Sequence, residues 1–424
     1  MGRNFVYIIV LLLCNITVNA FDNRYVFKKL NNEDGLTYNT VHDIAQEESG
    51  IIWFATKQGL NSYDSYNIKR YYREDGQGIP SNFTTSLLIT KNNRLFVGTD
   101  RGAIEYNRRL DRFEALLIDG NELPGVTTFC ETTNGIILIG THRGIYTYYP
   151  TQNKIIKFIS LQDENITSIA ESNANSFFVT TSSGVYILNS DGVLLEYYNT
   201  TNSPGLSTNL INKVFIDKNK NYWIGTDNGG LYLFDNSNKS FSKVRLAETD
   251  QAETKVVRDI EEDSSGNIWI CSELGVFILN PETNESINIQ HSLEKSEYSL
   301  NDNATYCVFR SKEDIMWIGT YFGGINYTNL SNFKGFFNIY PGDGKNELRG
   351  KAVNKIFKDS KGILWVATED GGVCSFDTGK KEVINYYQHK GKNSLSSNNI
   401  HAICEDKNGN IWFGHFMTGI DIFK

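Results

Sequence analysis

The residues best suited to hold a ligand stand at one recurring place, between the Thr and the Gly of a repeated phrase. They are Arg101, His142, Arg143, Asp227, Asn228, Tyr321 and Phe322. Arginine and histidine can bind the carboxylate or sulfate of an acidic sugar. Asparagine and aspartate can hydrogen-bond to sugar hydroxyls, and aromatic rings can contact the C–H groups of a sugar ring. A solvated loop surface is the competing interpretation for the polar residues, and a contact between domains competes equally for Tyr321 and Phe322.

Motifs of catalysis are missing from the sequence. It contains no GxSxG, no HExxH, no phosphate-binding loop with its lysine, and no Cys or His spacing typical of a metal site. The only acid and base pairings that the repeat positions suggest are Asp227 with His142 and Asp43 with His42. We therefore expect no catalytic residues, no metal and no cofactor, and an enzyme is the less favoured interpretation.

The phrase that carries these residues occurs nine times. It is centred on Trp53, Phe96, Leu138, Phe178, Trp223, Trp269, Trp317, Trp365 and Trp412, and successive centres lie 40 to 48 residues apart. Four short strands alternate with turns in each repeat, and this period and content are typical of a β-propeller blade. We interpret Trp53, Trp223, Trp269, Trp317, Trp365 and Trp412 as structural residues that pack between blades rather than as stacking platforms for a ligand.

A ring of polar residues precedes the aromatic centres by eleven positions, on the first strand of each repeat. Its members are His42, Thr85, Thr127, Thr167, Asn212, Arg258, Tyr306, Asn354 and His401. The residues nine positions before the centres are apolar throughout. Because the first strand of a blade is innermost, the polar ring is expected to line the central channel. His42 and His401 are expected to be hydrogen-bonded channel residues.

The nine repeats divide into seven and two. Residues 25–30 form an orphan strand that can complete the seventh repeat and close a ring without free sheet edges. The sequence therefore predicts an all-β chain, with a seven-bladed β-propeller over residues 21–330 followed by the first two blades of a second, incomplete propeller over residues 331–424.

Bulk properties narrow the class of protein. The formal charge of −8 argues against binding of nucleic acid. Residues 1–20 combine Arg3, an apolar run and a small-residue cleavage site, and this pattern is typical of a secretory signal peptide. An uncleaved membrane anchor is the alternative. The five cysteines that follow are expected to be small buried side chains.

Several stretches resemble a known family. Gly319–Tyr327, Phe337–Asn346, Trp365–Gly372, Gly391–His401 and Ile411–Asp421 are similar to the two-component regulator propeller repeats, and in particular to the periplasmic sensor region of Bacteroides-type hybrid two-component systems. In that family two seven-bladed propellers precede a β-sandwich, a transmembrane helix and a histidine kinase. Since this chain stops about five blades early, it is expected to be a fragment or a truncated form.

The resemblance implies a function. It indicates an exported, periplasmic sensor module that binds oligosaccharide breakdown products and regulates polysaccharide-utilisation genes through a kinase absent from this chain. It implies a homodimer as a possible state of the full-length sensor, and membrane attachment only through a missing C-terminal part or an uncleaved signal. The alternatives are a propeller lyase or hydrolase that acts on a glycan and a scaffold for protein interactions.

Overall fold

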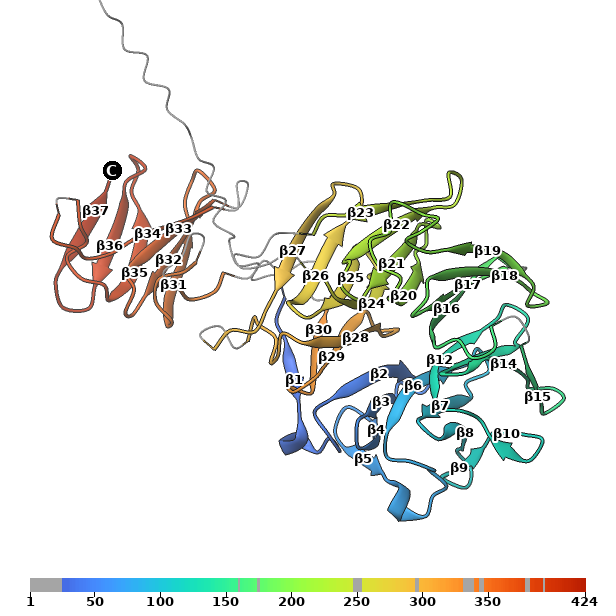
Figure 1. The fold of residues 1–424 in the computed structure, drawn as a ribbon. Helices are drawn as coiled ribbons and strands as arrows, with labels where there is room; N and C mark the ends of the chain where they lie inside the picture. The colour runs from blue at the N-terminus through green and yellow to red at the C-terminus, as the bar shows by residue number, and fades with distance from the viewer. Residues whose placement is uncertain are drawn as a thin grey trace, which may run out of the picture. The chain divides into compact units, whose positions relative to one another are not determined.

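The fold was analysed in a computed structural model (Figure 1). The structure describes residues 25–158, 161–173, 176–246, 254–293, 297–330, 339–342, 347–377, 382–391 and 393–424. The predicted signal peptide, residues 1–20, lies outside these ranges. Two compact units are present, a first unit (Arg24–Lys334) and a second unit that contains Gly335–Lys424. Each is taken by itself below.

The first unit is built from four-stranded antiparallel sheets, here called blades. Seven are found within the described residues, a number consistent with a seven-bladed ring. Blade 1 holds β2 (Val41–Gln46), β3 (Ile52–Thr56), β4 (Gly59–Tyr63) and β5 (Ile68–Tyr71). Blade 2 holds β6 (Thr84–Ile89), β7 (Leu95–Thr99), β8 (Gly102–Asn107) and β9 (Arg112–Ala115). Blade 3 holds β12 (Val126–Glu131), β13 (Ile137–Thr141), β14 (Gly144–Tyr149) and β15 (Lys154–Lys157).

The remaining blades repeat this order from the inner strand outwards. Blade 4 holds β16 (Ile166–Asn173), β17 (Ser176–Thr181), β18 (Val185–Asn189) and β19 (Leu194–Tyr198). Blade 5 holds β20 (Ile211–Ile216), β21 (Tyr222–Thr226), β22 (Leu231–Asp235) and β23 (Ser240–Val244). Blade 6 holds β24 (Val257–Glu262), β25 (Ile268–Ser272), β26 (Gly275–Asn280) and β27 (Glu285–Ile289). Short additions are the hairpin β10 (Leu117–Ile118) and β11 (Asn121–Glu122) and the 3-10 helices η1 (Asn32–Asp34) and η2 (Arg73–Asp75).

Blade 7 joins the two ends of the first unit. It holds β28 (Thr305–Arg310), β29 (Ile315–Thr320) and β30 (Ile325–Asn329), and its outer strand is β1 (Lys28–Leu30), which pairs antiparallel with β30. Each inner strand lies beside the next, from β2 through β6, β12, β16, β20 and β24 to β28, and β28 lies beside β2 again. The inner strands therefore form a closed ring around a central channel (Figure 1). The predicted all-β propeller class is confirmed.

Every inner strand carries a β-bulge at the same place. The register shifts between the residues twelve and ten positions before the aromatic centre, as at Val41 and Asp43 in β2 or Val257 and Asp259 in β24. The extra residue is the one eleven positions before the centre, so it belongs to the polar ring recognised in the sequence. Because a bulge sets two residues of one strand opposite a single partner, it turns successive side chains towards the same side. The bulge thus gives the channel two rings of side chains instead of one.

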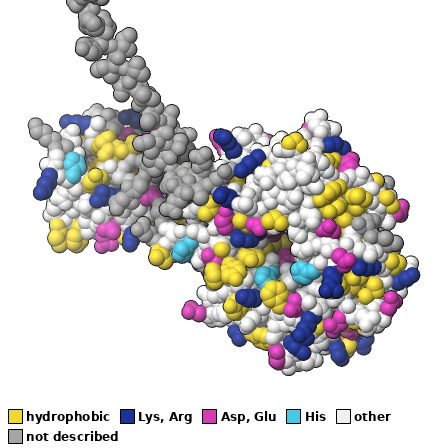
Figure 2. Space-filling view, viewed as in Figure 1, with side chains coloured by type: hydrophobic (Ala, Val, Ile, Leu, Met, Phe, Trp, Pro, Cys, Tyr) yellow, Lys and Arg dark blue, Asp and Glu magenta, His cyan; other side chains and the backbone are white. Residues whose placement is uncertain are grey.

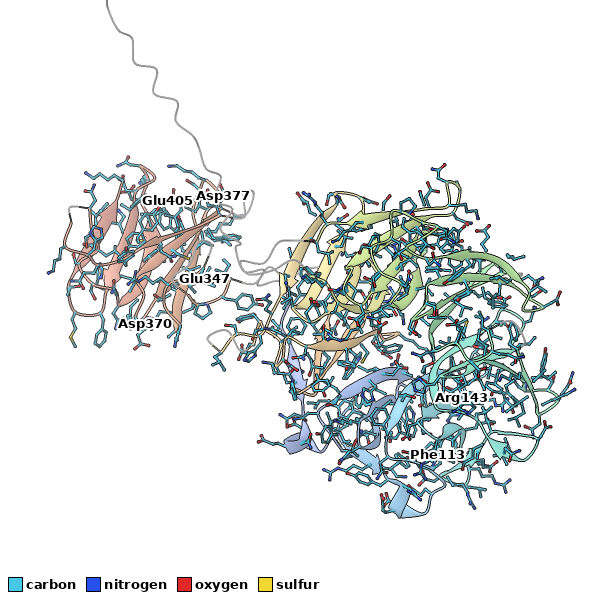
Figure 3. The ribbon with its side chains drawn as sticks, viewed as in Figure 1. Phe113, Arg143, Glu347, Asp370, Asp377 and Glu405 are labelled. Atoms are coloured by element: carbon cyan, nitrogen blue, oxygen red, sulfur yellow. The ribbon has the colours of Figure 1, made fainter. Side chains whose placement is uncertain are left out.

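The repeat aromatics fill the space between blades, where large side chains such as Phe113 also lie (Figure 3). Trp53 of blade 1 packs edge-on against Tyr106 of blade 2 at 5.1 Å, and the Trp317 ring of blade 7 lies 5.8 Å from Phe54 of blade 1. Trp53, Trp223, Trp269, Trp317 and Trp365 are buried, and Trp412 is half-buried. The position of the five buried indoles inside the packing makes them unavailable to a ligand.

Five of these indoles donate to a carboxylate six residues earlier in the chain. Trp223 Nε1 donates to Asp217 at 3.0 Å, and the same bond joins Trp53 to Glu47, Trp269 to Asp263, Trp365 to Asp359 and Trp412 to Asp406. Asp217 also accepts from the backbone of Asn219 and Asn221 in the turn that precedes the strand. These acidic turns therefore shape a hairpin and satisfy a buried indole.

The second unit repeats the design. It holds a four-stranded sheet of β31 (Val353–Lys358), β32 (Leu364–Thr368), β33 (Val373–Asp377) and β34 (Glu382–Tyr386), and a three-stranded sheet of β35 (Ile400–Glu405), β36 (Ile411–His415) and β37 (Ile420–Phe423). Trp365 and Phe413 pack between these sheets at 5.6 Å. The bulge recurs in β31 and β35.

Two further findings concern the cysteines and membrane spans. Cys271, Cys307 and Cys374 are buried as expected, but Cys130 is only half-buried and Cys404 is exposed. Within the described residues, the strand of Cys404 has no blade beyond it on one side. In the described part of the chain, no helix is long and apolar enough to cross a membrane.

Candidate functional site

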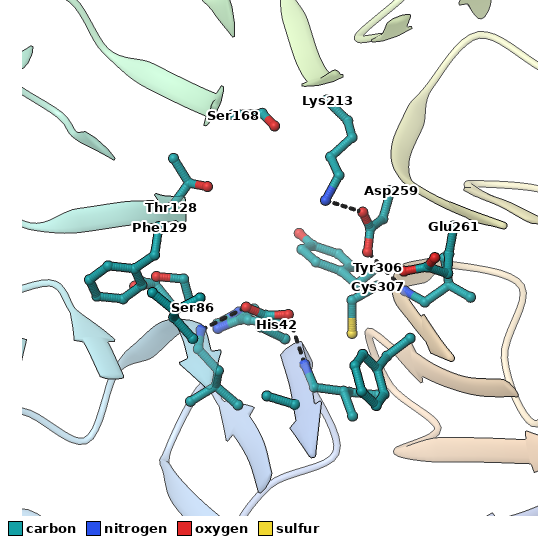
Figure 4. A pocket seen from close by; sticks show the side chains of 18 of the residues that line it. His42, Ser86, Thr128, Phe129, Ser168, Lys213, Asp259, Glu261, Tyr306 and Cys307 are labelled. Atoms are coloured by element: carbon teal, nitrogen blue, oxygen red, sulfur yellow. Dashed lines mark hydrogen bonds and ion pairs between the residues drawn. The ribbon is translucent and has the colours of Figure 1, made fainter. Parts of the chain in front are cut away.

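A cavity of about 580 Å³ occupies the centre of the first unit (Figure 4). All seven inner strands contribute to its wall. The bulge residues His42, Thr85, Thr127, Thr167, Asn212, Arg258 and Tyr306 form one ring, and the residues after them, Asp43, Ser86, Thr128, Ser168, Lys213, Asp259 and Cys307, form a second. The polar ring predicted from the sequence thus lines the channel.

Most bulge residues bind the next blade. The hydroxyl of Thr85 donates to the carbonyl of Val126 at 2.6 Å, and Thr127, Thr167 and Asn212 make the same bond to the first residue of the following inner strand. His42 Nδ1 lies 2.7 Å from the carbonyl oxygen of Thr84. Because a carbonyl can only accept, Nδ1 carries the proton. The polarity of this ring therefore serves blade-to-blade bonding first.

The second ring differs between the two sides of the channel. Blades 2, 3 and 4 contribute the short polar residues Ser86, Thr128 and Ser168, whereas blades 1, 5 and 6 contribute Asp43, Lys213 and Asp259 (Figure 4). Lys213 Nζ pairs with Asp259 at 2.7 Å. The carboxylates also link blades, since Asp43 accepts from the Leu87 amide at 2.7 Å and Asp259 from the Val308 amide at 2.9 Å.

Burial in the cavity wall shifts the pKa values of the titratable groups. Burial raises the pKa of Asp43 to about 7, against the opposing effect of the Leu87 amide, and burial likewise raises the pKa of Glu261 to about 7. Burial alone lowers the pKa of Lys213, but attraction to Asp259 outweighs it and the net pKa lies above the ordinary value. Burial, assisted by the charge of Lys57, lowers the pKa of His42. His42 is therefore neutral at neutral pH, with Nε2 free to accept a hydrogen bond.

An aromatic cluster lies at the mouth of the channel where the predicted loop tips project. The Tyr306 ring lies 5.6 Å from Tyr321 and 5.8 Å from His42, and Tyr321 meets Phe322 edge-on at 4.4 Å. His42 also contacts Phe83 at 5.0 Å. Phe322 is 71% exposed and Phe83 37%. Figure 2 shows histidine and hydrophobic side chains beside each other on one face of the first unit. We call Phe83, His42, Tyr306, Tyr321 and Phe322 the mouth cluster.

The predicted site residues all lie in turns between the second and third strands of blades. Arg101 is exposed between β7 and β8, and His142 and Arg143 are exposed between β13 and β14, where Figure 3 labels Arg143. His142 Nδ1 lies 2.7 Å from Asn165 Oδ1, so this histidine is committed to a neighbouring loop. Asp227 and Asn228 lie between β21 and β22 in blade 5. The structure brings Tyr321 and Phe322 together with the channel residues, and these two become the core of the candidate site.

Neither acid and base pairing suggested by the sequence is formed. Asp227 belongs to blade 5 and His142 to blade 3, with blade 4 between them and Asn165 as the partner of His142. His42 and Asp43 are sequence neighbours, but the imidazole binds Thr84 and the carboxylate binds the amides of Ile44 and Leu87. Within the described residues, no group of three or more His, Cys, Asp or Glu side chains is placed to hold a metal ion.

Sequence reasoning identified Arg258 as a member of the channel-lining ring but missed the second ring. The Arg258 guanidinium donates to the Thr305 carbonyl at 3.2 Å and lies 5.0 Å from the centre of the Tyr306 ring. Asp43, Lys213 and Asp259 form no pattern that repeats from blade to blade. The signal that was available is the register itself, because a polar residue followed by another polar residue in a strand of otherwise alternating character indicates a bulge.

Comparison with known proteins shows which proteins share this architecture. Residues 205–228, 347–370 and 394–416 match the family model of the two component regulator propeller. The extracellular domain of a hybrid two component system from B. thetaiotaomicron is 26% identical with a TM-score of 0.77, and the match covers 94% of this chain and 53% of that one. The chain thus spans about half the length of that domain. The predicted resemblance is confirmed.

Two other proteins are similar over less of their sequence or only in fold. Histidine kinase P4 of Formosa agariphila is 38% identical over 56 residues, which are 13% of this chain and 4% of the kinase. Virginiamycin B lyase from Staphylococcus aureus has a TM-score of 0.55 at 12% identity, and the match covers 72% of this chain and 99% of the lyase. At that identity the likeness to the lyase concerns the fold alone.

Proposed function

We propose that this chain, which carries two-component regulator propeller repeats, is the ligand-binding part of an exported sensor in a hybrid two-component system. The likeness to a solved extracellular domain of such a system supports the proposal. In the proposed role the chain lies in the periplasm and binds oligosaccharide breakdown products. Binding then regulates polysaccharide-utilisation genes through a histidine kinase.

The observation that carries the ligand class is the mouth cluster. Exposed aromatic rings beside hydrogen-bonding groups suit a sugar, because a pyranose presents C–H groups on its faces and hydroxyls around its rim. Phe322 and Phe83 offer open ring surface, and His42 Nε2 offers an acceptor. The cluster stands on the rigid inner strands and their adjoining turns, and such scaffolds hold variable binding loops in place.

Binding must also differ between two states of the sensor if it is to signal. A ligand shifts a conformational equilibrium only by its difference in affinity for the two states. We infer that this difference arises at the Phe322 side chain, which is exposed, while the backbone of its turn is held by the Asp302 carboxylate, which accepts from the Phe322 amide at 2.8 Å, and by the Thr40 hydroxyl, which donates to the Tyr321 carbonyl.

The test is a glycan array on the exported chain, followed by product analysis of every glycan that binds. The expected result is saturable binding of an oligosaccharide that stays intact, and roughly fivefold weaker binding by Phe322→Ala, since loss of one exposed stacking ring costs about 1 kcal/mol. Formation of shortened or unsaturated sugars would instead establish a propeller lyase or hydrolase. Absence of binding to every glycan would leave a scaffold for protein interactions as the surviving interpretation.

A further inference from the structure

We propose that the ligand at the channel mouth is an acidic oligosaccharide whose carboxylate or sulfate group binds Arg258. This inference rests on the proposed function and names the chemistry of its ligand. Arg258 lies in the cavity wall on β24, at the bulge position of blade 6. Among the bulge residues of the first unit it is the one that carries a charge at neutral pH, since His42 is neutral there.

The guanidinium is held in place but not neutralised. One of its N–H groups donates to the Thr305 carbonyl, and its central carbon lies 5.0 Å from the centre of the Tyr306 ring. In the described part of the chain, no carboxylate lies within ion-pair distance of Arg258. An arginine has five N–H donors in a planar fork that matches a carboxylate or sulfate. Most of these donors therefore remain available to an anionic ligand.

The acidic residues near this mouth are already engaged by backbone amides. Glu273 accepts from the amides of Lys255 and Val256, and Asp302 accepts from those of Ala304 and Phe322. A carboxylate bound in this way is directed at its own loop and is stabilised as the charged form. These acids therefore hold the loops in shape and keep their own negative charge, and neither forms an ion pair with Arg258.

The mouth cluster extends from Arg258 in a continuous row. The guanidinium contacts Tyr306, Tyr306 contacts Tyr321, and Tyr321 contacts Phe322, at 5.0, 5.6 and 4.4 Å between ring or group centres. Each separation is comparable with the width of a sugar ring, so the row has room for more than one sugar residue. The acidic sugar lies at the Arg258 end, and a sugar further along the oligosaccharide contacts the exposed ring of Phe322.

The same repeat position supplies a substitution that tests the role of the charge. Asn212 occupies the bulge of blade 5 and donates its amide to the Val257 carbonyl at 3.0 Å, just as Arg258 donates to Thr305 in the next blade. Arg258→Asn therefore removes the charge while it retains a side chain that this fold already uses for the blade-to-blade bond. Arg112→Gln is the matched control, because Arg112 is exposed on the outer strand β9.

The experiment measures binding by calorimetry to three probes: a galacturonic acid trimer, a sulfated galactose trimer and an unmodified galactose trimer. We expect one of the two acidic probes to bind, with ~10- to 100-fold loss in Arg258→Asn, as for removal of a hydrogen bond to a charged group, and no loss in Arg112→Gln. Preference between the acidic probes separates carboxylate from sulfate. Raised salt should weaken this binding, and thermal melting verifies that Arg258→Asn is folded.

Failure of the inference is distinguishable from failure of the proposed function. Equal binding of the neutral and acidic probes, or undiminished acidic binding by folded Arg258→Asn, overturns the inference and leaves the glycan sensor standing. Lack of binding to all three probes and to the wider glycan array overturns both.

Discussion

The buried pair of Asp217 and Trp223 yields the sharpest quantitative prediction. Asp217 is 3% exposed and accepts four hydrogen bonds, from the amides of Asn219 and Asn221, from the side chain of Asn221 and from Trp223 Nε1. In Asp217→Ala the backbone amides of the turn can hydrogen-bond to water instead, but the indole N–H of Trp223 stays buried without its acceptor. An unsatisfied buried donor costs ~1–3 kcal/mol, and loss of the turn contacts adds ~1 kcal/mol. We expect the free energy of unfolding of the first unit to fall by ~2–4 kcal/mol.

The assay is urea unfolding followed by tryptophan fluorescence, with thermal melting beside it. The matched control is Asp235→Ala, because Asp235 caps a similar hairpin through Ser237 and Asn238 but has no indole to satisfy and is only half-buried. A smaller effect is expected there. Equal shifts of the unfolding midpoint in Asp217→Ala and Asp235→Ala would refute the idea that the buried indole dominates.

The repeat centred on Trp317 lacks the acid that binds the indole in the other repeats with tryptophan. Trp317 Nε1 is buried and has no hydrogen-bond partner within the described residues, because the position six residues before it is Ser311 rather than an acid. Ser311→Asp should supply the acceptor that five other repeats have and raise the stability by ~1 kcal/mol. A neutral or destabilising result would show that the neighbouring acid Glu313 outweighs the new bond.

Two further predictions concern the channel and the turns. Burial raises the folded-state pKa of Asp43 to about 7, above the ordinary value near 3.8, so its contribution to stability is complete below pH 3.8 and is lost as the pH rises through 7. Asp43→Asn should therefore flatten the decline in melting temperature between about pH 4 and 7, by ~1 kcal/mol because channel water screens part of the shift, and an unchanged pH profile would contradict this. Gly78→Ala should destabilise by ~3–5 kcal/mol in urea unfolding, since Gly78 has φ +93° and an added Cβ would stand 2.1 Å from the Phe113 carbonyl oxygen. Gly50→Ala, at φ +90° with open space around it, should cost only ~1–2 kcal/mol, and similar losses in both variants would exclude the contact as the cause.

The fold was predictable because its information is repeated. Nine copies of one phrase reveal strand order, turn positions and the packing aromatics, and any copy that is degenerate, such as that centred on Leu138, is read by its spacing from the others. The polar ring eleven positions before the centres could also be recognised by comparing copies. A feature that every blade shares is thus visible without any structure.

The site was less predictable because it consists of differences between copies. Arg101, His142 and Arg143 were selected for their chemistry, but nothing in the sequence indicates that His142 is bound to Asn165 or that Tyr321 contacts Tyr306. These contacts join residues from different loops or blades. They depend on the bulge, which sets the direction of each side chain and does not appear in a count of apolar and polar positions.

The mouth cluster shows how a repeated scaffold acquires a particular site. At the bulge position, Thr85, Thr127, Thr167 and Asn212 use their polar groups for hydrogen bonds to the next blade. Little of their hydrogen-bonding capacity therefore remains for a ligand. Tyr306 need not bond to the next blade in this way, because the Sγ atom of the following residue, Cys307, lies 3.8 Å from the Val41 carbonyl oxygen instead.

Arg258 and His42 each bond to a carbonyl of the next blade through one nitrogen and keep their remaining nitrogens for the cavity. These three residues occupy blades 6, 7 and 1, which are consecutive in the closed ring. The excess binding capacity is therefore concentrated on one arc of the channel, beside the exposed ring of Phe322. In the other blades, short side chains make the bond to the next blade. This arc is therefore where substitutions that favour a ligand can change the surface without breaking the contacts between blades.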